Sequence, residues 1–268
     1  MDPSPSSTHI AETYHSTISK IKVNGATAVL KRYRRRDTRA VSQFAKEVSI
    51  LQSLTSHPNI TTILSSDAED LTVTLTYSPG RTLDEFIDTA TLKCTLSQNE
   101  GATIQLQMAK ALSFIHDEGM FHDDVKPDNI IYDPAGQNAV LVDFGAALRV
   151  PKDASGMVEF NPSGTPSYAP PEFLEQKKSI KGDVWALGVT MLFVRGCVKL
   201  PDGNWLLPAV FEDKAVRKEM ESWLEEVEGW RKKASVNGVD GLLGEMLESD
   251  PERRIGSEKL LQRMLETR

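Results

Sequence analysis

The stretch from Phe121 to Ile131 constrains this chain more than any other part of its sequence. It reads FHDDVKPDNII, and Asp143-Phe144-Gly145 follows fourteen residues after Asn129. Aspartate and asparagine are common in turns, so each of these residues alone would be unremarkable. Their combination is distinctive, because Asn129 and Asp143 stand five and nineteen residues after Asp124, with a lysine and a proline in between.

This combination matches the requirements of phosphoryl transfer from ATP. The reaction needs a carboxylate that orients the attacking hydroxyl and accepts its proton, oxygen ligands for magnesium, and a cation near the transferred group. Asp124 supplies the carboxylate and Lys126 the cation. Asn129 and Asp143 supply the oxygen ligands that a hard ion such as Mg²⁺ prefers. The sequence therefore predicts a catalytic pair, Asp124 and Lys126, beside a metal-binding pair, Asn129 and Asp143.

The residues before position 78 have the character of a small β-rich unit. Asn24-Gly25 between two β-type runs is a strong hairpin signal. An amphipathic helix is predicted over 41–54, and alternating runs at 60–64 and 71–77 predict two further strands. Glu47 lies beside the apolar stripe of the helix, and a carboxylate so placed needs a cationic partner. The basic run over 32–39 is interpreted as a solvated loop.

The break at Ser78-Pro79-Gly80 marks the boundary between two lobes. The pattern after it is mostly helical, with predicted helices at 98–117, 181–194, 214–233, 241–248 and 257–266 and short strands at 130–132 and 139–142. We therefore predict an α+β bilobal fold. It has a disordered N-terminus at 1–10, rich in Ser and Pro, a β-rich N-lobe with one helix at 11–78, and a larger, mainly α-helical C-lobe at 79–268. The cleft between the lobes is the default ligand site.

Several motifs, in this order, resemble those of the eukaryotic-type protein kinases over about residues 17–265. His122-Asp123-Asp124 stands where the family usually has His-Arg-Asp. Ala28-Val29-Leu30-Lys31 resembles the strand lysine motif, and Leu75-Thr76-Tyr77-Ser78 resembles the hinge. Residues 164–172 resemble the end of the activation segment, residues 183–188 the core helix and residues 250–254 a late helix motif.

The resemblance implies roles for further residues. ATP and Mg²⁺ are the implied cofactors. Lys31 would bind the α/β-phosphates with Glu47 as its partner, and adenine would lie at Leu75, Thr76 and Tyr77 between Val29 and Ile131. The implied structural residues are His122, Phe144, Asp183, which braces the catalytic loop, and Arg254, which pairs with Glu172. Lys126 and Thr165 resemble the serine/threonine kinases rather than the tyrosine kinases, so the implied partner is a protein or peptide with a Ser/Thr hydroxyl.

The sequence departs from the family pattern in four places. No G-x-G-x-x-G loop precedes Lys31, so either the stretch around 14–19 would cover the phosphates with fewer amides or the site would be more open. In both cases we expect a high nucleotide KM. Asp123 replaces an arginine that normally receives an activation-segment phosphate, which a carboxylate would repel. We therefore predict activity without phosphorylation there, for example on Ser155, Ser163 or Ser167. Val29 in place of alanine would narrow the adenine pocket, and the proline at Pro170 is interpreted as benign.

Composition narrows the partners and the location. A net charge of −7 and a pI near 5.4 argue against nucleic acid as the main partner. Two cysteines without zinc-type spacing favour a reducing compartment. The start of the chain lacks a secretory pattern, and the apolar run Val184–Val194 is too short to span a bilayer. We expect a cytoplasmic or nuclear protein without a membrane partner, while the oligomeric state stays open.

Three functional hypotheses fit these observations. The first is an active serine/threonine protein kinase. The second is a pseudokinase scaffold, supported only by the missing Gly-rich loop. The third is a kinase-like enzyme that phosphorylates a small molecule or a pathway peptide, supported by the compact chain and the unusual N-lobe. A scaffold has no physical need for a complete base and magnesium set, and this weighs against the second.

Overall fold

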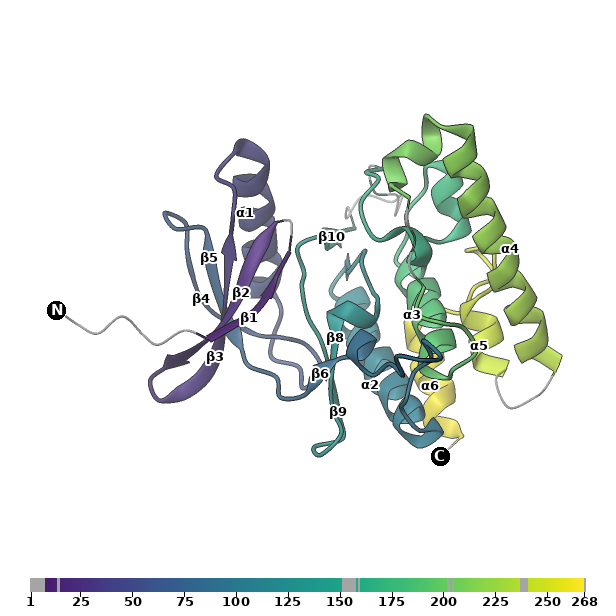
Figure 1. The fold of residues 1–268 in the computed structure, drawn as a ribbon, viewed down its shortest axis with the longest axis horizontal. Helices are drawn as coiled ribbons and strands as arrows, with labels where there is room; N and C mark the ends of the chain where they lie inside the picture. Colours follow the sequence, from purple (N-terminus) through teal and green to yellow (C-terminus); the bar gives the residue numbers. More distant parts are fainter. Residues whose placement is uncertain are drawn as a thin grey trace.

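The chain folds into two lobes of different character, as the sequence predicts. The computed structural model describes residues 8–13, 15–150, 158, 160–201, 203, 205–236 and 241–267. Figure 1 shows a small lobe of strands with one helix beside a larger lobe made mainly of helices. The predicted α+β bilobal fold is confirmed. None of the described helices is long and apolar enough to cross a membrane.

The N-lobe is built on a five-stranded sheet with the strand order β1-β2-β3-β5-β4, in which every neighbouring pair is antiparallel. The strands are β1 (Thr8–Glu12), β2 (Ser16–Val23), β3 (Ala26–Tyr33), β4 (Ile63–Asp67) and β5 (Thr72–Thr76). Asn24 and Gly25 both have positive φ, at 50° and 82°, and they join β2 to β3 as the Asn-Gly pair predicts.

The predicted disordered N-terminus over 1–10 is wrong at residues 8–10, and residues 1–7 lie outside the described part of the chain. Strand β1 starts at Thr8, opposite Lys20 of β2. All five of its residues are exposed. An edge strand of this kind is held by main-chain pairing, so it lacks the apolar alternation by which a half-buried strand is recognised.

The single N-lobe helix, α1 (Thr38–Ser53), starts three residues before the prediction. Asp37 caps it by accepting a hydrogen bond from the Ala40 amide at 2.9 Å, a role typical of aspartate. The interpretation of 32–39 as a solvated loop is therefore wrong at both ends, because β3 continues to the buried Tyr33 and α1 begins at Thr38. Between them, Arg36 forms an exposed ion pair with Asp70 at 3.0 Å.

The helices of the C-lobe are close to their predicted positions. They are α2 (Gln98–Asp117), α3 (Lys181–Val194), α4 (Lys214–Val236), α5 (Gly241–Met246) and α6 (Ser257–Glu266). A capping box formed by Ser97 and Glu100 begins α2. Every residue of α3 from Asp183 to Val194 is buried, which confirms a core helix of the C-lobe.

Short strands and turns connect the helices of the C-lobe. The strands are β6 (Arg81–Thr82), β7 (Met120–Phe121), β8 (Ile130–Asp133), β9 (Asn138–Leu141) and β10 (Leu148–Arg149), and the 3₁₀ turns are η1 (Leu83–Glu85), η2 (Pro127–Asn129), η3 (Pro166–Tyr168), η4 (Pro171–Glu175) and η5 (Leu207–Phe211). Because β7 pairs with β10 and β8 with β9, the loop that contains Asp124 and the loop that contains Asp143 are brought to one place.

The two lobes meet at β9 and at the predicted boundary. The Thr61 amide donates to the Leu141 carbonyl at 3.0 Å, and the Leu141 amide donates to the Asn59 carbonyl at 2.9 Å. Gly80 has a φ of 103°, and a Cβ placed there would lie 2.1 Å from the Tyr132 carbonyl oxygen. Only glycine fits this close approach. The chain therefore passes from one lobe to the other at 78–80 in close contact with the main chain of β8.

Candidate active site

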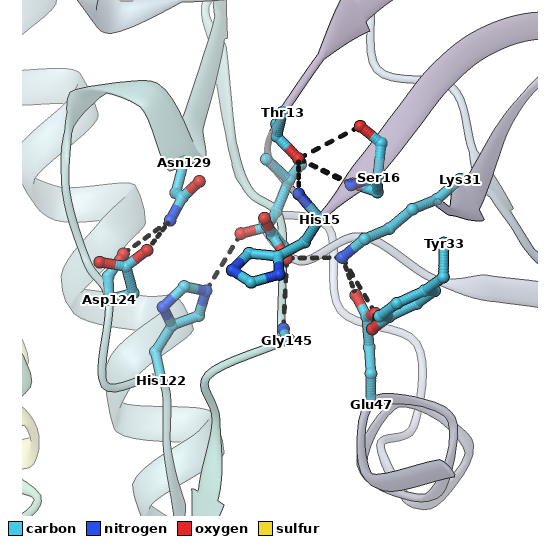
Figure 2. Close-up of polar contacts among 12 residues, drawn as sticks. Thr13, His15, Ser16, Lys31, Tyr33, Glu47, His122, Asp124, Asn129 and Gly145 are labelled. Carbon is cyan, nitrogen blue, oxygen red and sulfur yellow. Dashed lines mark hydrogen bonds and ion pairs between the residues drawn. The ribbon is translucent and has the colours of Figure 1, made fainter. Parts of the chain in front are cut away.

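Lys31 forms the centre of a charged group on the N-lobe side of the site (Figure 2). Its Nζ lies 2.7 and 2.9 Å from the two carboxylate oxygens of Glu47 and 2.7 Å from Oδ1 of Asp143. The Tyr33 hydroxyl donates to Glu47 Oε2 at 2.5 Å. The predicted pairing of Lys31 with Glu47 is therefore present, with Glu47 fully buried on α1.

The charges in this group hold one another in their ionised forms. Burial lowers the pKa of Lys31, but the charges of Asp143 and Glu47 outweigh it, and the net pKa is raised. Desolvation raises the pKa of Asp143, but Lys31 more than offsets this and lowers the pKa to about 2. The site therefore presents a charged amine and a charged carboxylate over the whole physiological pH range.

Asp124 is the centre of a second group, on the C-lobe side. Its Oδ1 accepts a hydrogen bond from the Thr165 hydroxyl at 2.6 Å. Its Oδ2 lies 3.0 Å from Asn129 Nδ2 and 3.2 Å from Lys126 Nζ. Lys126 Nζ also donates to the Thr165 hydroxyl at 2.8 Å. The structure thus brings together Asp124, Lys126 and Asn129, as predicted, and adds Thr165 as a direct partner of the carboxylate.

Asn129 and Asp143 offer oxygen atoms that fit a magnesium ion. Asn129 Nδ2 donates to both the main-chain carbonyl and Oδ2 of Asp124, at 2.8 and 3.0 Å. The amide is therefore oriented with its nitrogen toward Asp124, and its oxygen is the atom left for a cation. A Cβ at Gly145 would lie 3.2 Å from Asp143 Oδ1 and 3.6 Å from Lys31 Nζ. Because Gly145 has no side chain, the space beside Asp143 Oδ1 and Lys31 Nζ stays free. The oxygen atoms of Asn129 and Asp143 are ligands that suit Mg²⁺.

Asp183, at the start of α3, holds the loop that carries Asp124, which we call the catalytic loop. Its Oδ2 accepts from the His122 amide at 2.7 Å, and its Oδ1 accepts from the Asp123 amide at 2.9 Å. These bonds hold Asp123 at a φ of 63°, a left-handed conformation that is costly for a residue other than glycine. The predicted bracing role of Asp183 matches this geometry.

His116 also contacts Asp183, and it was not among the residues predicted from the sequence. Its Nε2 lies 3.0 Å from Asp183 Oδ2, and its Nδ1 lies 2.7 Å from the Ser257 hydroxyl. Burial raises the pKa of Asp183, but the hydrogen bond and charge of His116, with the charge and main-chain amide of His122, outweigh it and lower the pKa. A buried carboxylate needs such a partner, and this requirement is the only sign in the sequence that could have pointed to one.

The other predicted structural residues form two pairs. The rings of His122 and Phe144 meet edge to face with centroids 4.8 Å apart, and His122 Nε2 lies 3.0 Å from the Val142 carbonyl. Arg254 NH1 and NH2 donate to the two oxygens of Glu172 at 2.7 and 2.8 Å, and both residues are buried. This bidentate pair ties η4 to the loop before α6.

The predicted adenine-binding residues lie at the junction of the lobes. Val29 of β3 is directly opposite Leu75 of β5, and the Thr76 hydroxyl accepts from the Thr62 amide at 3.0 Å. Tyr77 accepts a hydrogen bond from Lys20 at 3.1 Å. Ile131 lies in β8, beside Val140 of β9. Their contact with a nucleotide stays a prediction.

The turn between β1 and β2 stands where a Gly-rich loop would cover the phosphates. The Thr13 hydroxyl accepts from the amides of His15 and Ser16, at 3.3 and 3.0 Å. Two main-chain donors of this turn are thus used within it. Figure 2 shows the ring of His15 pointing from the turn toward the region between Lys31 and His122. Tyr14, at the start of the stretch predicted to cover the phosphates, lies outside the described residues.

Asp123 has partners that the sequence did not predict. Lys178 Nζ donates to Asp123 Oδ2 at 2.5 Å, and the Ser163 hydroxyl donates to the same oxygen at 2.6 Å. Lys178 follows another lysine in the chain and was not singled out. A buried aspartate beside the catalytic residue implies a cation, but the sequence does not say which one.

Taken together, the two charged groups and the braced loop between a β-rich lobe and a helical lobe define a site for phosphoryl transfer. Three parts required by that chemistry are present: a positioned carboxylate, oxygen ligands for a metal, and two lysines. The amine of Lys31 and the carboxylate of Asp124 come from different lobes, so the site depends on the bilobal fold.

Comparisons with known proteins agree with this geometry. The model of the protein kinase domain matches residues 13–265. Serine/threonine-protein kinase PEPKR2 of Arabidopsis thaliana is 33% identical over 171 residues, which are 62% of this chain and 34% of that protein. Maternal embryonic leucine zipper kinase of Xenopus tropicalis is 33% identical over 191 residues, 70% of this chain and 26% of that protein. Serine/threonine-protein kinase ppk34 of Schizosaccharomyces pombe is 31% identical over 225 residues, 81% of this chain and 58% of that protein.

The chain belongs to the protein kinase family. The predicted family, the fold class and the assignment to the phosphotransferases are confirmed. The chain spans only 26% to 58% of the length of these three relatives, so it corresponds to one part of each of them.

Proposed function

We propose that this protein is an ATP-dependent serine/threonine protein kinase that uses Mg²⁺ and works without a phosphate on its activation segment. The observation that carries the proposal is the contact set of Asp124 with Thr165, Lys126 and Asn129, at 2.6, 3.2 and 3.0 Å. It joins the side chains that we assign as general base, cation and metal ligand in one hydrogen-bonded group. The three relatives described above, two of which carry serine/threonine kinase names, support the same class of substrate.

Each residue of the site has a distinct part in the proposed reaction. Asp124 orients the acceptor hydroxyl and takes its proton as the new O–P bond forms. Lys126 offsets charge on the transferred phosphoryl group, and Lys31 holds the phosphates of the nucleotide. Asn129 and Asp143 would hold the metal. When bound, magnesium-ATP supplies the phosphoryl group and the metal charge that neutralises it.

Incubation with labelled ATP and magnesium tests the proposal. Wild-type protein should transfer label to a protein or peptide hydroxyl, and Asp143→Ala should transfer none. ATP turnover only when small metabolites are added would instead favour a small-molecule kinase. No turnover and no thermal shift with magnesium-ATP would favour a pseudokinase scaffold. The Lys31–Glu47 pair is already formed, and this favours a working site over a scaffold.

The proposed independence from phosphorylation rests on two sets of contacts. Asp123 pairs with Lys178, so the position that would receive a phosphate carries a satisfied carboxylate. Arg149 donates to the Ser53 hydroxyl at 2.5 Å, and Lys46 donates to the Ala146 carbonyl at 3.3 Å. These bonds join α1, which carries Glu47, to the segment that follows Gly145.

We expect phosphatase-treated protein, shown by mass spectrometry to carry no phosphate, to keep kcat within about twofold of the untreated protein, because the ion pairs among the described residues of the site form without one. Of the three hydroxyls considered, Ser163 is bonded to Asp123, Ser167 is buried, and Ser155 lies outside the described residues. A loss of more than tenfold after treatment, restored by rephosphorylation, would contradict the prediction.

We also expect weak nucleotide binding, with a Kd toward the upper end of the range of about 1 μM to 1 mM that is usual for KM values. The physical reason is that Thr13 occupies two amides of the turn that would otherwise face the phosphates. Titration calorimetry with magnesium-ATP measures the Kd, and Lys31→Met serves as the control that the heat comes from this site. A Kd near the low end of that range would contradict the prediction.

A further inference from the structure

The buried ion pair between Lys178 and Asp123 and the side chain of Ser163 form one compact group beside the catalytic loop. Lys178 Nζ lies 2.5 Å from Asp123 Oδ2, 2.8 Å from the Ser163 hydroxyl and 3.2 Å from the Ser163 carbonyl. The Ser163 hydroxyl also donates to Asp123 Oδ2. The side chains of Lys178 and Asp123 are only 5% and 11% exposed, so solvent provides little alternative for either charge.

The three residues come from three separate parts of the chain. Asp123 precedes the catalytic Asp124, Ser163 lies two residues before Thr165, and Lys178 follows η4. Gly164 has a φ of 101°, and a Cβ there would lie 2.8 Å from the Asp123 carbonyl oxygen. The segment that carries Thr165 therefore runs against the catalytic loop at the point where Lys178 joins the two.

The charges around this group favour keeping Lys178 in place. Burial raises the pKa of Asp123 to about 6, while the charge and hydrogen bond of Lys178 oppose that rise and the charge of Asp183 adds to it. Lys46 of α1 also faces the group, with a pKa lowered mainly by burial. Without Lys178 the carboxylate would lose its nearest cation, and a buried charge without a partner is strongly unfavourable.

We propose that Lys178 is a positioning residue for phosphoryl transfer: through Asp123 and Ser163 it holds the segment that carries Thr165 against the catalytic loop. This inference rests on the proposed kinase function. The amine of Lys178 thus contacts Asp123, which stands where the family usually has an arginine that receives an activating phosphate. The consequence for catalysis is direct, because Thr165 donates to Asp124 at 2.6 Å and accepts from Lys126 at 2.8 Å.

The test compares two adjacent lysines of opposite burial. Lys178→Met keeps the length of the side chain and removes its charge, whereas Lys177→Met alters an exposed ion pair with Glu175. We expect Lys178→Met to lower kcat by about 10- to 100-fold with the KM for ATP within about twofold, and Lys177→Met to change neither. This magnitude corresponds to the loss of one hydrogen bond to a charged group. Lys178→Arg keeps the charge and should recover most of the rate.

Hydrogen exchange gives a second readout that does not depend on activity. Lys178→Met should speed exchange at the amides of residues 163–165 relative to Lys177→Met. If Lys178→Met does not fold, Ser163→Ala keeps both charges and should speed the same exchange and lower kcat about threefold. A folded Lys178→Met or Ser163→Ala protein with wild-type kcat and wild-type exchange would overturn the inference. A wild-type protein without transferase activity would instead overturn the proposed function, and the exchange comparison would still decide the role of Lys178.

Discussion

Replacing Asp124 by Asn is expected to lower kcat by about 10²–10⁴-fold, the usual loss when a positioned base is removed. The amide has nearly the shape of the carboxylate but cannot accept the proton of the attacking hydroxyl. It also carries no negative charge for Lys126, which lies 3.2 Å from Oδ2 in the wild type. Steady-state kinetics with a peptide substrate measures the loss, and the KM for ATP should stay nearly unchanged because the residues proposed to bind the nucleotide are other ones.

Asp128→Asn is the matched control for this prediction. Asp128 lies in the same loop but is exposed, so its substitution should leave kcat within about twofold, as is usual for surface positions. The thermal stability of both variants should be compared with that of the wild type, so that a folding defect is not mistaken for a catalytic one. An Asp124→Asn protein that is folded and has wild-type kcat would mean that Asp124 is not the base.

Much of this site could be predicted because its residues form recognisable local patterns in the sequence. Asp124, Asn129 and Asp143 stand in two short segments, and strand pairing then brings those segments together. Glu47 was recognisable because a carboxylate beside the apolar stripe of a helix needs a cation. Its partner Lys31, sixteen residues earlier, came from the resemblance to the kinase strand motif, as did the Glu172–Arg254 pair.

The partners that were missed lie far away in sequence and have no local signature. Lys178 is 55 residues from Asp123 and sits next to Lys177, which is exposed, so the pair looks like ordinary surface charge. His116 is 67 residues from Asp183 and lies in the last turn of α2, where a histidine also stabilises the helix dipole. Neither contact could be assigned until the fold placed the residues side by side.

The errors in the fold came from elements that do not rely on apolar periodicity. Strand β1 is exposed along its whole length, so it offers no alternation to recognise. Helix α1 is capped by Asp37 and begins at Thr38, three residues before the predicted start at Val41. By contrast, α2, with a capping box, and α3, with a long apolar run after Asp183, have the predicted bounds, because caps and long apolar patterns are strong signals.

Arg254→Met is expected to lower the melting temperature by about 6–20 °C. Losing one partner of a buried ion pair costs about 3–5 kcal/mol, and 1 kcal/mol shifts Tm by about 2–4 °C for a domain of this size. The substitution leaves the buried Glu172 carboxylate without its bidentate partner. It also removes the bonds from Arg254 to the main-chain carbonyls of Glu248 and Lys181, at 2.8 and 3.1 Å. Scanning calorimetry measures the shift.

Two further variants separate the loss of the pair from other effects. Arg253 is adjacent but its side chain is 75% exposed, so Arg253→Met should shift Tm by less than about 2 °C, as expected for a surface substitution within ~0.5 kcal/mol. The double variant Glu172→Gln/Arg254→Met removes both charges and should recover part of the loss, because an uncharged pair leaves no unpaired ion in the core. Equal Tm values for Arg254→Met and Arg253→Met would show that the pair does not stabilise the fold. If the double variant is no more stable than Arg254→Met, the unpaired carboxylate is not the source of the loss, and the missing main-chain bonds are.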